Sequence, residues 1–255
     1  MKTVLIATNN AHKAEEIASA LAFEDWEFRT LRELGIRSDP AEDADSFEGN
    51  ARIKALAAHE ASGGMAALAD DSGLQVDALG GAPGVYSARY AGEDATDAQN
   101  NAKLLAALAD VPDEKRTARF VSTLVFVDED GAETVAHGTV EGRVGHEGRG
   151  SEGFGYDPLF FPDVFGGERT LAEVSQAEKN AVSHRGNALR AVGKPSKAAS
   201  ESRGSRGPVW GIIRLHHRAL VAQWIEQRTS NPSAAGSSPA GRTRNSQASR
   251  VLRLA

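Results

Sequence analysis

The chain of 255 residues contains no cysteine and no long apolar run. The lack of cysteine excludes disulfides, thiolate metal sites and cysteine nucleophiles, and it fits a reducing compartment. No apolar run approaches the roughly 20 residues that a membrane-spanning helix needs. The apolar start, residues 1–7, is too short for a signal peptide and predicts a first strand instead. We therefore expect a cytoplasmic protein with no membrane partner.

Acidic residues are scarce at one end of the chain. Residues 194–255 hold 11 of the 29 Lys and Arg residues but only 2 of the 35 Asp and Glu residues. Residues 1–193 are correspondingly acidic, which argues against a broad nucleic-acid surface. An acidic body suits a small anionic substrate only where a metal and local cations offset the repulsion. The contrast predicts two regions, a folded domain over residues 1–193 and a basic, disordered tail over 194–255.

The tail has a second peculiarity. Residues 220–242 resemble the in-frame translation of a transfer-RNA gene, and Gly236-Ser237-Ser238-Pro239 can be encoded by a T-arm sequence. We expect that a frameshift or read-through joined this tail to an enzyme, so that it carries no selected function. The alternative is a nucleic-acid-binding extension, and genomic DNA without a cloverleaf-forming 3′ region would exclude the first reading.

Apolar periodicity predicts alternating strands and helices before the tail. Strands are expected at residues 4–7, 26–30, 65–69, 120–127, 134–144 and 159–161. Helices are expected at about residues 14–21, 46–61, 96–109 and 175–192, and residues 74–90 read as a glycine-rich loop. Capping boxes at Thr96 with Gln99 and at Ser175 with Glu178 open the last two helices. The order β-α-β-α-β-α-β-β-β-α indicates an α/β fold with a mixed sheet.

Four short polar segments interrupt the predicted alternation of strands and helices. The first segment follows the first strand and reads Thr8-Asn9-Asn10-Ala11-His12-Lys13. Free backbone N–H groups and the positive end of the following helix favour an anion there. Lys13 adds a charge. The alternative is that the asparagines turn the chain and cap the helix. The segment lacks the glycine and lysine spacing of a P-loop.

The second segment is Asp70-Asp71, with Ser72 and Gly73 after it, at the predicted end of a strand. Adjacent carboxylates favour a cation, and Mg²⁺ takes one or two carboxylates together with waters and phosphates. One carboxylate could also deprotonate or orient a water molecule. Glu42 could supply a second metal ligand. The alternative for the pair is one capping and one solvated aspartate.

The third and fourth segments carry aromatic and basic groups. Phe154-Gly155-Tyr156-Asp157 places two aromatic rings in a glycine loop, where they could stack on a base or plug the core. Lys179, His184 and Arg185 share the last predicted helix or its end. Arg185 and a suitable tautomer of His184 could donate to a 6-oxo base, or these residues could be ordinary surface charges.

Taken together, these segments resemble the family of noncanonical purine nucleoside triphosphate pyrophosphatases, the inosine/xanthosine triphosphate pyrophosphatases. The resemblance covers about residues 1–192 and includes two further stretches, residues 80–90 and 92–97. It implies a two-lobed fold with a central cleft, a homodimer and Mg²⁺ as cofactor. It also implies hydrolysis of ITP, dITP and XTP to monophosphate and pyrophosphate, which would cleanse the nucleotide pool.

The resemblance also implies residue roles. Asp71 matches the proton acceptor and a magnesium ligand, and Glu42 matches a further metal-binding acid. Lys54 matches a lysine that contacts substrate. The positions that match substrate contacts are Thr8, Asn9, Asn10, Ala11, His12, Lys13, Ser72, Phe154, Gly155, Tyr156, Asp157, Lys179, His184 and Arg185.

Two departures from the family pattern stand out. Gly49 precedes Asn50 where many relatives have an acid, so a metal role for the displaced Glu48 is weakened. Gly193-Lys194-Pro195 interrupts the last helix, which normally continues. Two other functions remain open: a pyrophosphatase for modified pyrimidine nucleotides, and a nucleotide-binding module without turnover.

Overall fold

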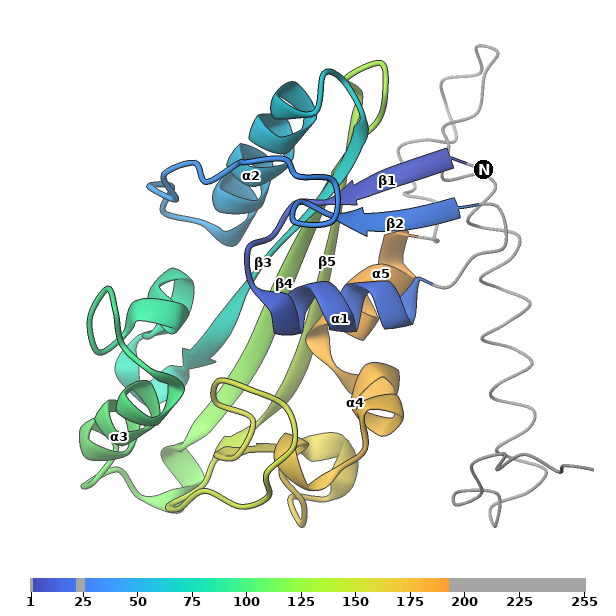
Figure 1. The fold of residues 1–255 in the computed structure, drawn as a ribbon. Helices are drawn as coiled ribbons and strands as arrows, with labels where there is room; N and C mark the ends of the chain where they lie inside the picture. The colour runs from blue at the N-terminus through green and yellow to red at the C-terminus, as the bar shows by residue number, and fades with distance from the viewer. Residues whose placement is uncertain (1, 22–25, 193–255) are drawn as a thin grey trace, which may run out of the picture. The chain divides into compact units, whose positions relative to one another are not determined.

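Six strands form one mixed sheet in the order β2-β1-β3-β4-β5-β6. The strands are β1 Lys2–Ile6, β2 Trp26–Thr30, β3 Ala66–Val76, β4 Thr117–Val127, β5 Glu133–Val144 and β6 Phe160–Pro162. β1 runs parallel to β2 and β3, whereas β3, β4, β5 and β6 pair antiparallel in sequence (Figure 1). The computed structural model describes residues 2–21 and 26–192. The predictions for the tail lie outside these residues.

The helices are α1 Ala11–Ala20, α2 Phe47–Ala61, α3 Asp97–Ala107, α4 Gln176–Val182 and α5 His184–Val192. The capping boxes predicted at Thr96 and Ser175 are both present. Together with the strand order, these elements confirm the predicted α/β fold with a mixed sheet. None of the helices in the described part of the chain is long and apolar enough to cross a membrane.

β3 is longer than predicted, and this changes the setting of the aspartates. The strand was expected to end at Ala69, but it continues to Val76 because β4 pairs with it from Ala67 to Val76. Asp70 and Asp71 therefore lie in the middle of the strand, where successive side chains point to opposite faces. Residues 74–90, predicted as a loop with short extended pieces, contain the end of β3 and short 3₁₀ turns, including Gly84–Arg89.

The last predicted helix is broken. Ser183 takes an extended conformation between α4 and α5, and its hydroxyl accepts a hydrogen bond from the backbone N–H of Gly186. The break therefore serves as the start of a new helix, with His184 and Arg185 in its first turn. The predicted interruption at Gly193 lies outside the described residues.

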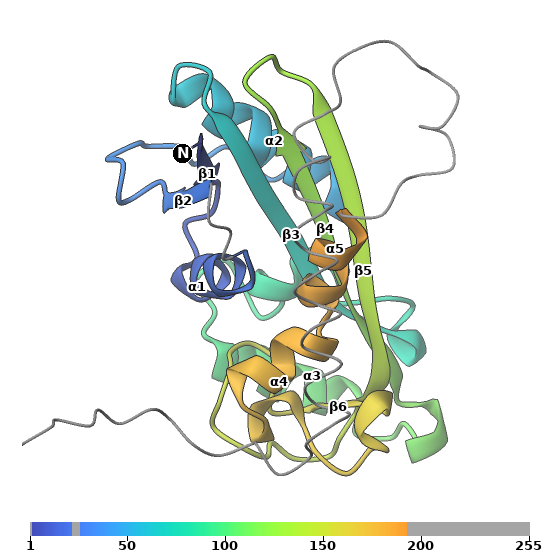
Figure 2. The same ribbon diagram turned by 90° about the vertical axis from the view of Figure 1, so that its right-hand side faces the viewer.

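Alternation along the strands divides the core between the two faces of the sheet. Even-numbered residues of β3 and β4, such as Leu68 and Leu124, pack with α1 and α5. Their odd-numbered neighbours, such as Ala67 and Val125, pack with α2 (Figures 1 and 2). A third cluster lies further along β3, β4 and β5 and includes Leu104 of α3. The functional residues lie between this cluster and the first two.

Candidate active site

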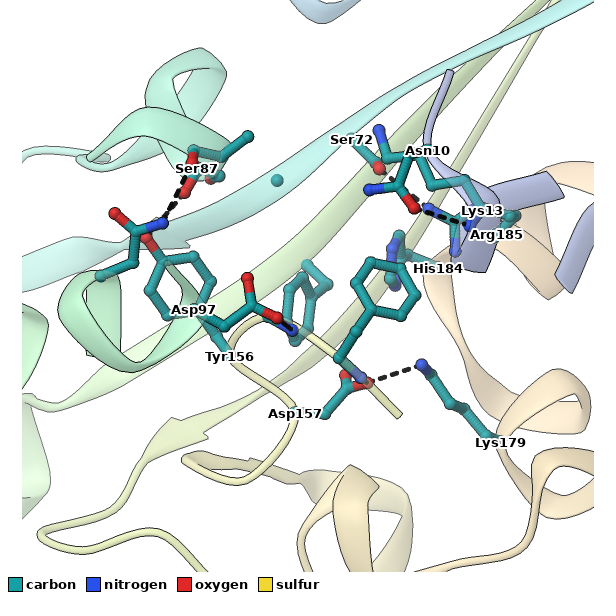
Figure 3. A pocket seen from close by; sticks show the side chains of 16 residues that line it. Asn10, Lys13, Ser72, Ser87, Asp97, Tyr156, Asp157, Lys179, His184 and Arg185 are labelled. Carbon is teal, nitrogen blue, oxygen red and sulfur yellow. Dashed lines mark hydrogen bonds and ion pairs between the residues drawn. The ribbon is translucent and has the colours of Figure 1, made fainter. Parts of the chain in front are cut away.

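Two adjoining cavities contain most of the residues predicted to bind a ligand. The first has a volume of about 100 Å³ and the second about 170 Å³. They share four lining residues, Asn10, Lys13, Ser72 and Ala88. The first cavity is walled by aromatic side chains together with buried charges (Figure 3). The second is lined mainly by polar and charged groups. A ligand that fills both therefore needs a flat apolar part joined to a charged part.

The start of α1 forms one wall of the second cavity. The side chain of Asn10 caps the helix by accepting a hydrogen bond from the N–H of Lys13 at 3.1 Å. The hydroxyl of Thr8 accepts one from the N–H of Asn10 at 3.2 Å. Asn10 thus caps the helix, as the alternative proposed, and Thr8, Asn9, Asn10 and Lys13 also line the cavity. A capped helix start beside a cavity is a suitable anion site.

Two residues of the same segment lie elsewhere. Ala11 and His12 are not among the described residues that line either cavity. The imidazole of His12 instead stacks on the ring of Phe154, with centroids 5.3 Å apart. The predicted contact of His12 therefore reduces, in this structure, to support for an aromatic wall.

Asp71, Lys54 and Glu42 form a compact charged group in the second cavity. The ammonium of Lys54 lies 2.8 Å from Asp71 Oδ1 and 2.9 Å from Glu42 Oε2. Burial raises the pKa of Asp71, and the charge of Lys54 only partly counteracts this. Burial lowers the pKa of Lys54, but Asp71 and Glu42 outweigh it, so that this pKa is raised. Lys54 is therefore held as a cation between the two acids.

The same group offers the best fit to a metal ion. Asp71 Oδ2 is buried and has no hydrogen-bond partner, although the other oxygen is paired. Across residues 2–21 and 26–192, no group of three or more His, Asp or Glu side chains is arranged as a complete metal site. Two carboxylates, one with a free oxygen, suit Mg²⁺, which completes its shell with waters and substrate phosphates.

The segment that carries Glu42 rests on α2. The backbone N–H of Ala44 donates to the side chain of Asn50 at 3.0 Å. Gly49 permits this approach, because a Cβ at that position would lie 2.5 Å from the Cβ of Ala44. Glu48 is turned away and pairs with Arg52 on the helix surface at 2.8 Å. Glu48 is not among the described residues that line the second cavity, which Glu42 does line.

Asp70 faces the opposite side of β3 and belongs to a buried ion network. Its carboxylate contacts the guanidinium of Arg185 at 3.1 Å and the ammonium of Lys13 at 3.2 Å. Burial alone would raise the pKa of Asp70, but Arg185 and Lys13 hold it well below the usual range. The two aspartates therefore lie on different sides of the strand, although the charge of Lys13 lowers the pKa of both.

Glu16 of α1 completes the network. It pairs with Lys179 of α4 at 2.5 Å and also with Arg185 of α5. Lys179 in turn contacts Asp157 at 2.6 Å (Figure 3). The network thus balances three cations, Lys13, Lys179 and Arg185, with the three carboxylates Glu16, Asp70 and Asp157. Lys179 and Arg185 are therefore held rigidly beside the first cavity, and they reach it from separate helices.

The aromatic wall is fixed by hydrogen bonds to the protein backbone. The hydroxyl of Tyr156 donates to the carbonyl of Ser87 at 2.8 Å. Two side chains of α3 hold Gly155: Asp97 accepts from its N–H at 2.6 Å, and Asn101 donates to its carbonyl at 3.0 Å. Sequence reasoning missed both α3 residues, because nothing in their spacing distinguishes them from ordinary polar positions of a helix.

His184 and Arg185 bring free polar nitrogens to the first cavity. The ring of His184 stacks on Phe120, and its Nδ1 is buried without a partner. Burial, together with the charge of Arg185, holds the pKa of His184 well below its usual range, so the ring is neutral. Arg185 Nε is also buried without a partner. Two unpaired nitrogens in an aromatic cavity are suited to the edge of a heterocyclic base.

Gly138 allows α5 to carry these residues so close to the sheet. A Cβ on Gly138 would lie 2.2 Å from the carbonyl oxygen of His184 and 2.2 Å from the backbone nitrogen of Ala188. Any larger residue at position 138 would therefore displace the first turn of α5, and with it His184 and Arg185.

An anion-binding helix start joined to an aromatic cavity, on a mixed α/β sheet, defines a nucleotide-binding protein of the α/β class. The comparisons are more specific. The sequence model of the Ham1 family matches residues 4–194, and the chain belongs to this family.

Curated relatives match over most of their length. The dITP/XTP pyrophosphatase of Pectobacterium atrosepticum is 50% identical over 193 residues, which cover 74% of this chain and 95% of the relative. The dITP/XTP pyrophosphatase of Exiguobacterium sibiricum is 47% identical over 188 residues, which cover 73% of this chain and 93% of the relative.

Solved structures share the fold. A HAM1 protein from Coxiella burnetii superposes with a TM-score of 0.67 at 40% identity, covering 79% of this chain and all of the other. The nucleoside-triphosphatase and dITP/XTP pyrophosphatase from Mycobacterium abscessus gives a TM-score of 0.61 at 45% identity, covering 74% of this chain and 98% of the other.

Proposed function

We propose that the chain hydrolyses dITP, ITP and XTP to the monophosphate and pyrophosphate, with Mg²⁺ as cofactor. The observation that carries this proposal is the pair of joined cavities, one aromatic with free base-facing nitrogens and one built on a helix start with Asp71. The names of the relatives, dITP/XTP pyrophosphatase, support the substrate class. Removing such nucleotides would cleanse the nucleotide pool of the cytoplasm.

Asp71 is the group best placed to take a proton from the attacking water. Its free Oδ2 faces no other protein donor, and its raised pKa makes it a stronger base than an exposed aspartate. The water oxygen forms a new bond to phosphorus, the bond to the leaving phosphate oxygen breaks, and Asp71 holds the proton released from the water. Lys13 and Lys54 offset the charge that moves onto the leaving group.

Asp71 and Glu42 would hold Mg²⁺, which neutralises phosphate charge when it is bound. Lys54 holds the two carboxylates together, because its ammonium contacts both of them. The segment around Glu42 is held by Asn50, so this acid is in position before substrate arrives.

The first cavity accounts for base selection. A 6-oxo group accepts hydrogen bonds from Arg185 Nε and from His184 in the tautomer that carries a proton on Nδ1. Adenine presents an amino group there and would leave these donors unpaired, at a cost of about 1–3 kcal/mol for each buried group. Guanine also has a 6-oxo group, so its exclusion has to depend on its 2-amino group.

A substrate panel tests this proposal. With Mg²⁺ present, we expect release of pyrophosphate from ITP, dITP and XTP with a kcat/KM at least about tenfold above that for ATP, since each of the two unpaired donors costs about fivefold to 150-fold. Faster turnover of uridine or thymidine analogues would replace the proposal with a pyrimidine-directed enzyme. Binding of ITP without any release of pyrophosphate would leave a nucleotide-binding module.

The pH dependence gives an independent check on Asp71. Burial raises the pKa of Asp71 in the metal-free protein, whereas a bound Mg²⁺ would lower it, so the acid limb of the kcat/KM profile is expected to move to lower pH as the Mg²⁺ concentration rises. Lys54→Met removes a charge that lowers this pKa, so the limb should move toward neutral pH as overall activity falls. The exposed Lys115→Met is the matched control and should leave the limb in place. A limb that does not move in Lys54→Met would exclude Asp71 as the titrating group.

We further propose a homodimer, as the family resemblance implies. Large apolar side chains remain exposed in the described part of the chain, among them Tyr86 at 58% and Val164 at 61%, and such side chains are typical of contact surfaces when they cluster. Light scattering on the full chain would show twice the mass of 26.9 kDa if this proposal is right.

A further inference from the structure

The charges of the second cavity do not suffice for a nucleoside triphosphate if its lysines act alone. Three acids, Asp39, Glu42 and Asp71, line this cavity. Lys13 already pairs with Asp70, and Lys54 already pairs with both Asp71 and Glu42. A bound triphosphate would add several negative charges, so a further cation is needed even where Mg²⁺ neutralises part of them.

Arg89 is such a cation. It ends the 3₁₀ turn Gly84–Arg89 and lines the second cavity but not the first. Its only carboxylate partner within the described residues is Glu93, at 3.7 Å, and that side chain is 86% exposed. An exposed ion pair of this length contributes little. Among the cations of this cavity, therefore, Arg89 is the one that is not committed to a buried acid.

The position of Arg89 is fixed by the same segment that carries Glu42. One terminal nitrogen of its guanidinium donates to the backbone carbonyl of Glu42 at 3.2 Å. A guanidinium has five N–H donors in a planar fork, so most of them stay available after this bond. The fork is thus pre-oriented beside the Asp71, Lys54 and Glu42 group, which is the geometry that favours bidentate binding of phosphate.

We propose that Arg89 binds the part of the substrate that leaves as pyrophosphate. The two cavities meet at Asn10, Lys13, Ser72 and Ala88, where the phosphate next to the nucleoside would lie. Arg89 lies beyond this junction, on the wall that only the second cavity has. It would therefore distinguish a triphosphate from a monophosphate, and stabilise the departing pyrophosphate. This inference rests on the proposed function of the same site.

Product inhibition separates this role from a purely structural one. With ITP as substrate and Mg²⁺ present, Arg89→Ala is expected to raise the inhibition constant of pyrophosphate by about tenfold to a hundredfold, the usual effect of losing a charged hydrogen bond. The inhibition constant of inosine monophosphate should change by less than about threefold. Arg89→Lys should fall between, because it retains the charge but not the fork.

Glu93→Gln is the matched control. It removes the exposed ion pair of Arg89 and keeps the guanidinium, so pyrophosphate inhibition should be unchanged or slightly stronger. An unchanged pyrophosphate constant in Arg89→Ala, or an equal weakening of both products, would overturn the inference while leaving wild-type ITP hydrolysis intact. Absence of ITP hydrolysis by the wild type would instead overturn the proposed function. Thermal unfolding of each variant confirms that it is folded.

Discussion

Replacing Asp71 with asparagine is expected to lower kcat for ITP by about 10³-fold or more, while the protein stays folded. Loss of a general base alone costs about 10²–10⁴-fold, and the same change removes one of the two carboxylates that we assign to Mg²⁺. The asparagine has nearly the same volume. Lys54 would keep Glu42 as its partner at 2.9 Å, so no buried cation is left unpaired.

The measurement is the rate of pyrophosphate release under saturating ITP and Mg²⁺, with circular dichroism to verify the fold. Asp77→Asn is the control, because this exposed aspartate lies outside both cavities and pairs with Thr117 and Arg119. It should retain wild-type turnover. If Asp71→Asn kept kcat within about tenfold of the wild type, Asp71 would have no central place in the chemistry.

The second large effect is expected at Glu16. Glu16→Gln should reduce the free energy of unfolding by about 3–5 kcal/mol, the usual cost of removing one partner from a buried ion pair. Glu16 neutralises both Lys179 and Arg185, and the network it belongs to balances three cations with three carboxylates. Without Glu16, one buried positive charge has no compensation.

Urea-induced unfolding at neutral pH measures this loss, and Glu15→Gln is a matched control because Glu15 is the exposed neighbour on the same helix. A change below about 1 kcal/mol in Glu16→Gln would show that water or rearrangement compensates the cations.

The loss of stability in acid provides a second check on the same ion network. Because the pKa of Asp70 is depressed, its stabilising contribution is present above the pH where an unfolded aspartate titrates. That contribution is lost as the pH falls through the lower pKa of the folded state.

Local patterns predicted the elements of this fold well. The capping boxes at Thr96 and Ser175 require only residues that are close in sequence, and both are present. The end of β3 could not be predicted in the same way, because it depends on pairing with β4, which lies about fifty residues away in the chain. The break at Ser183 was missed because its cap is incomplete in sequence: serine is a common N-cap, but Gly186 stands where a capping box has Glu or Gln.

The residues of the candidate site divide in the same way, into those that local sequence reveals and those that depend on distant partners. The polar segments around Lys13 and Asp71 stand out because they interrupt apolar runs, and both line the second cavity. Glu16 does not stand out, because an acid on an amphipathic helix is expected to face solvent. Only the approach of α4 and α5 buries it and supplies the cations that make its burial tolerable. Residues whose role depends on distant partners stay hidden until the chain is folded.

The placement of Asp70 and Asp71 on opposite faces of β3 limits how the sequence of this strand can evolve. Under the proposed function, one strand would serve base recognition on one face and the reaction on the other, and the face of each side chain depends on whether its position is odd or even. An insertion or deletion of one residue within Ala66–Val76 would exchange the two carboxylates at once. Substitutions around His184, by contrast, would alter base preference without moving Asp71 if His184 contacts the base as we propose. The choice of nucleotide could then diversify by point substitutions, whereas the length of β3 would have to stay unchanged.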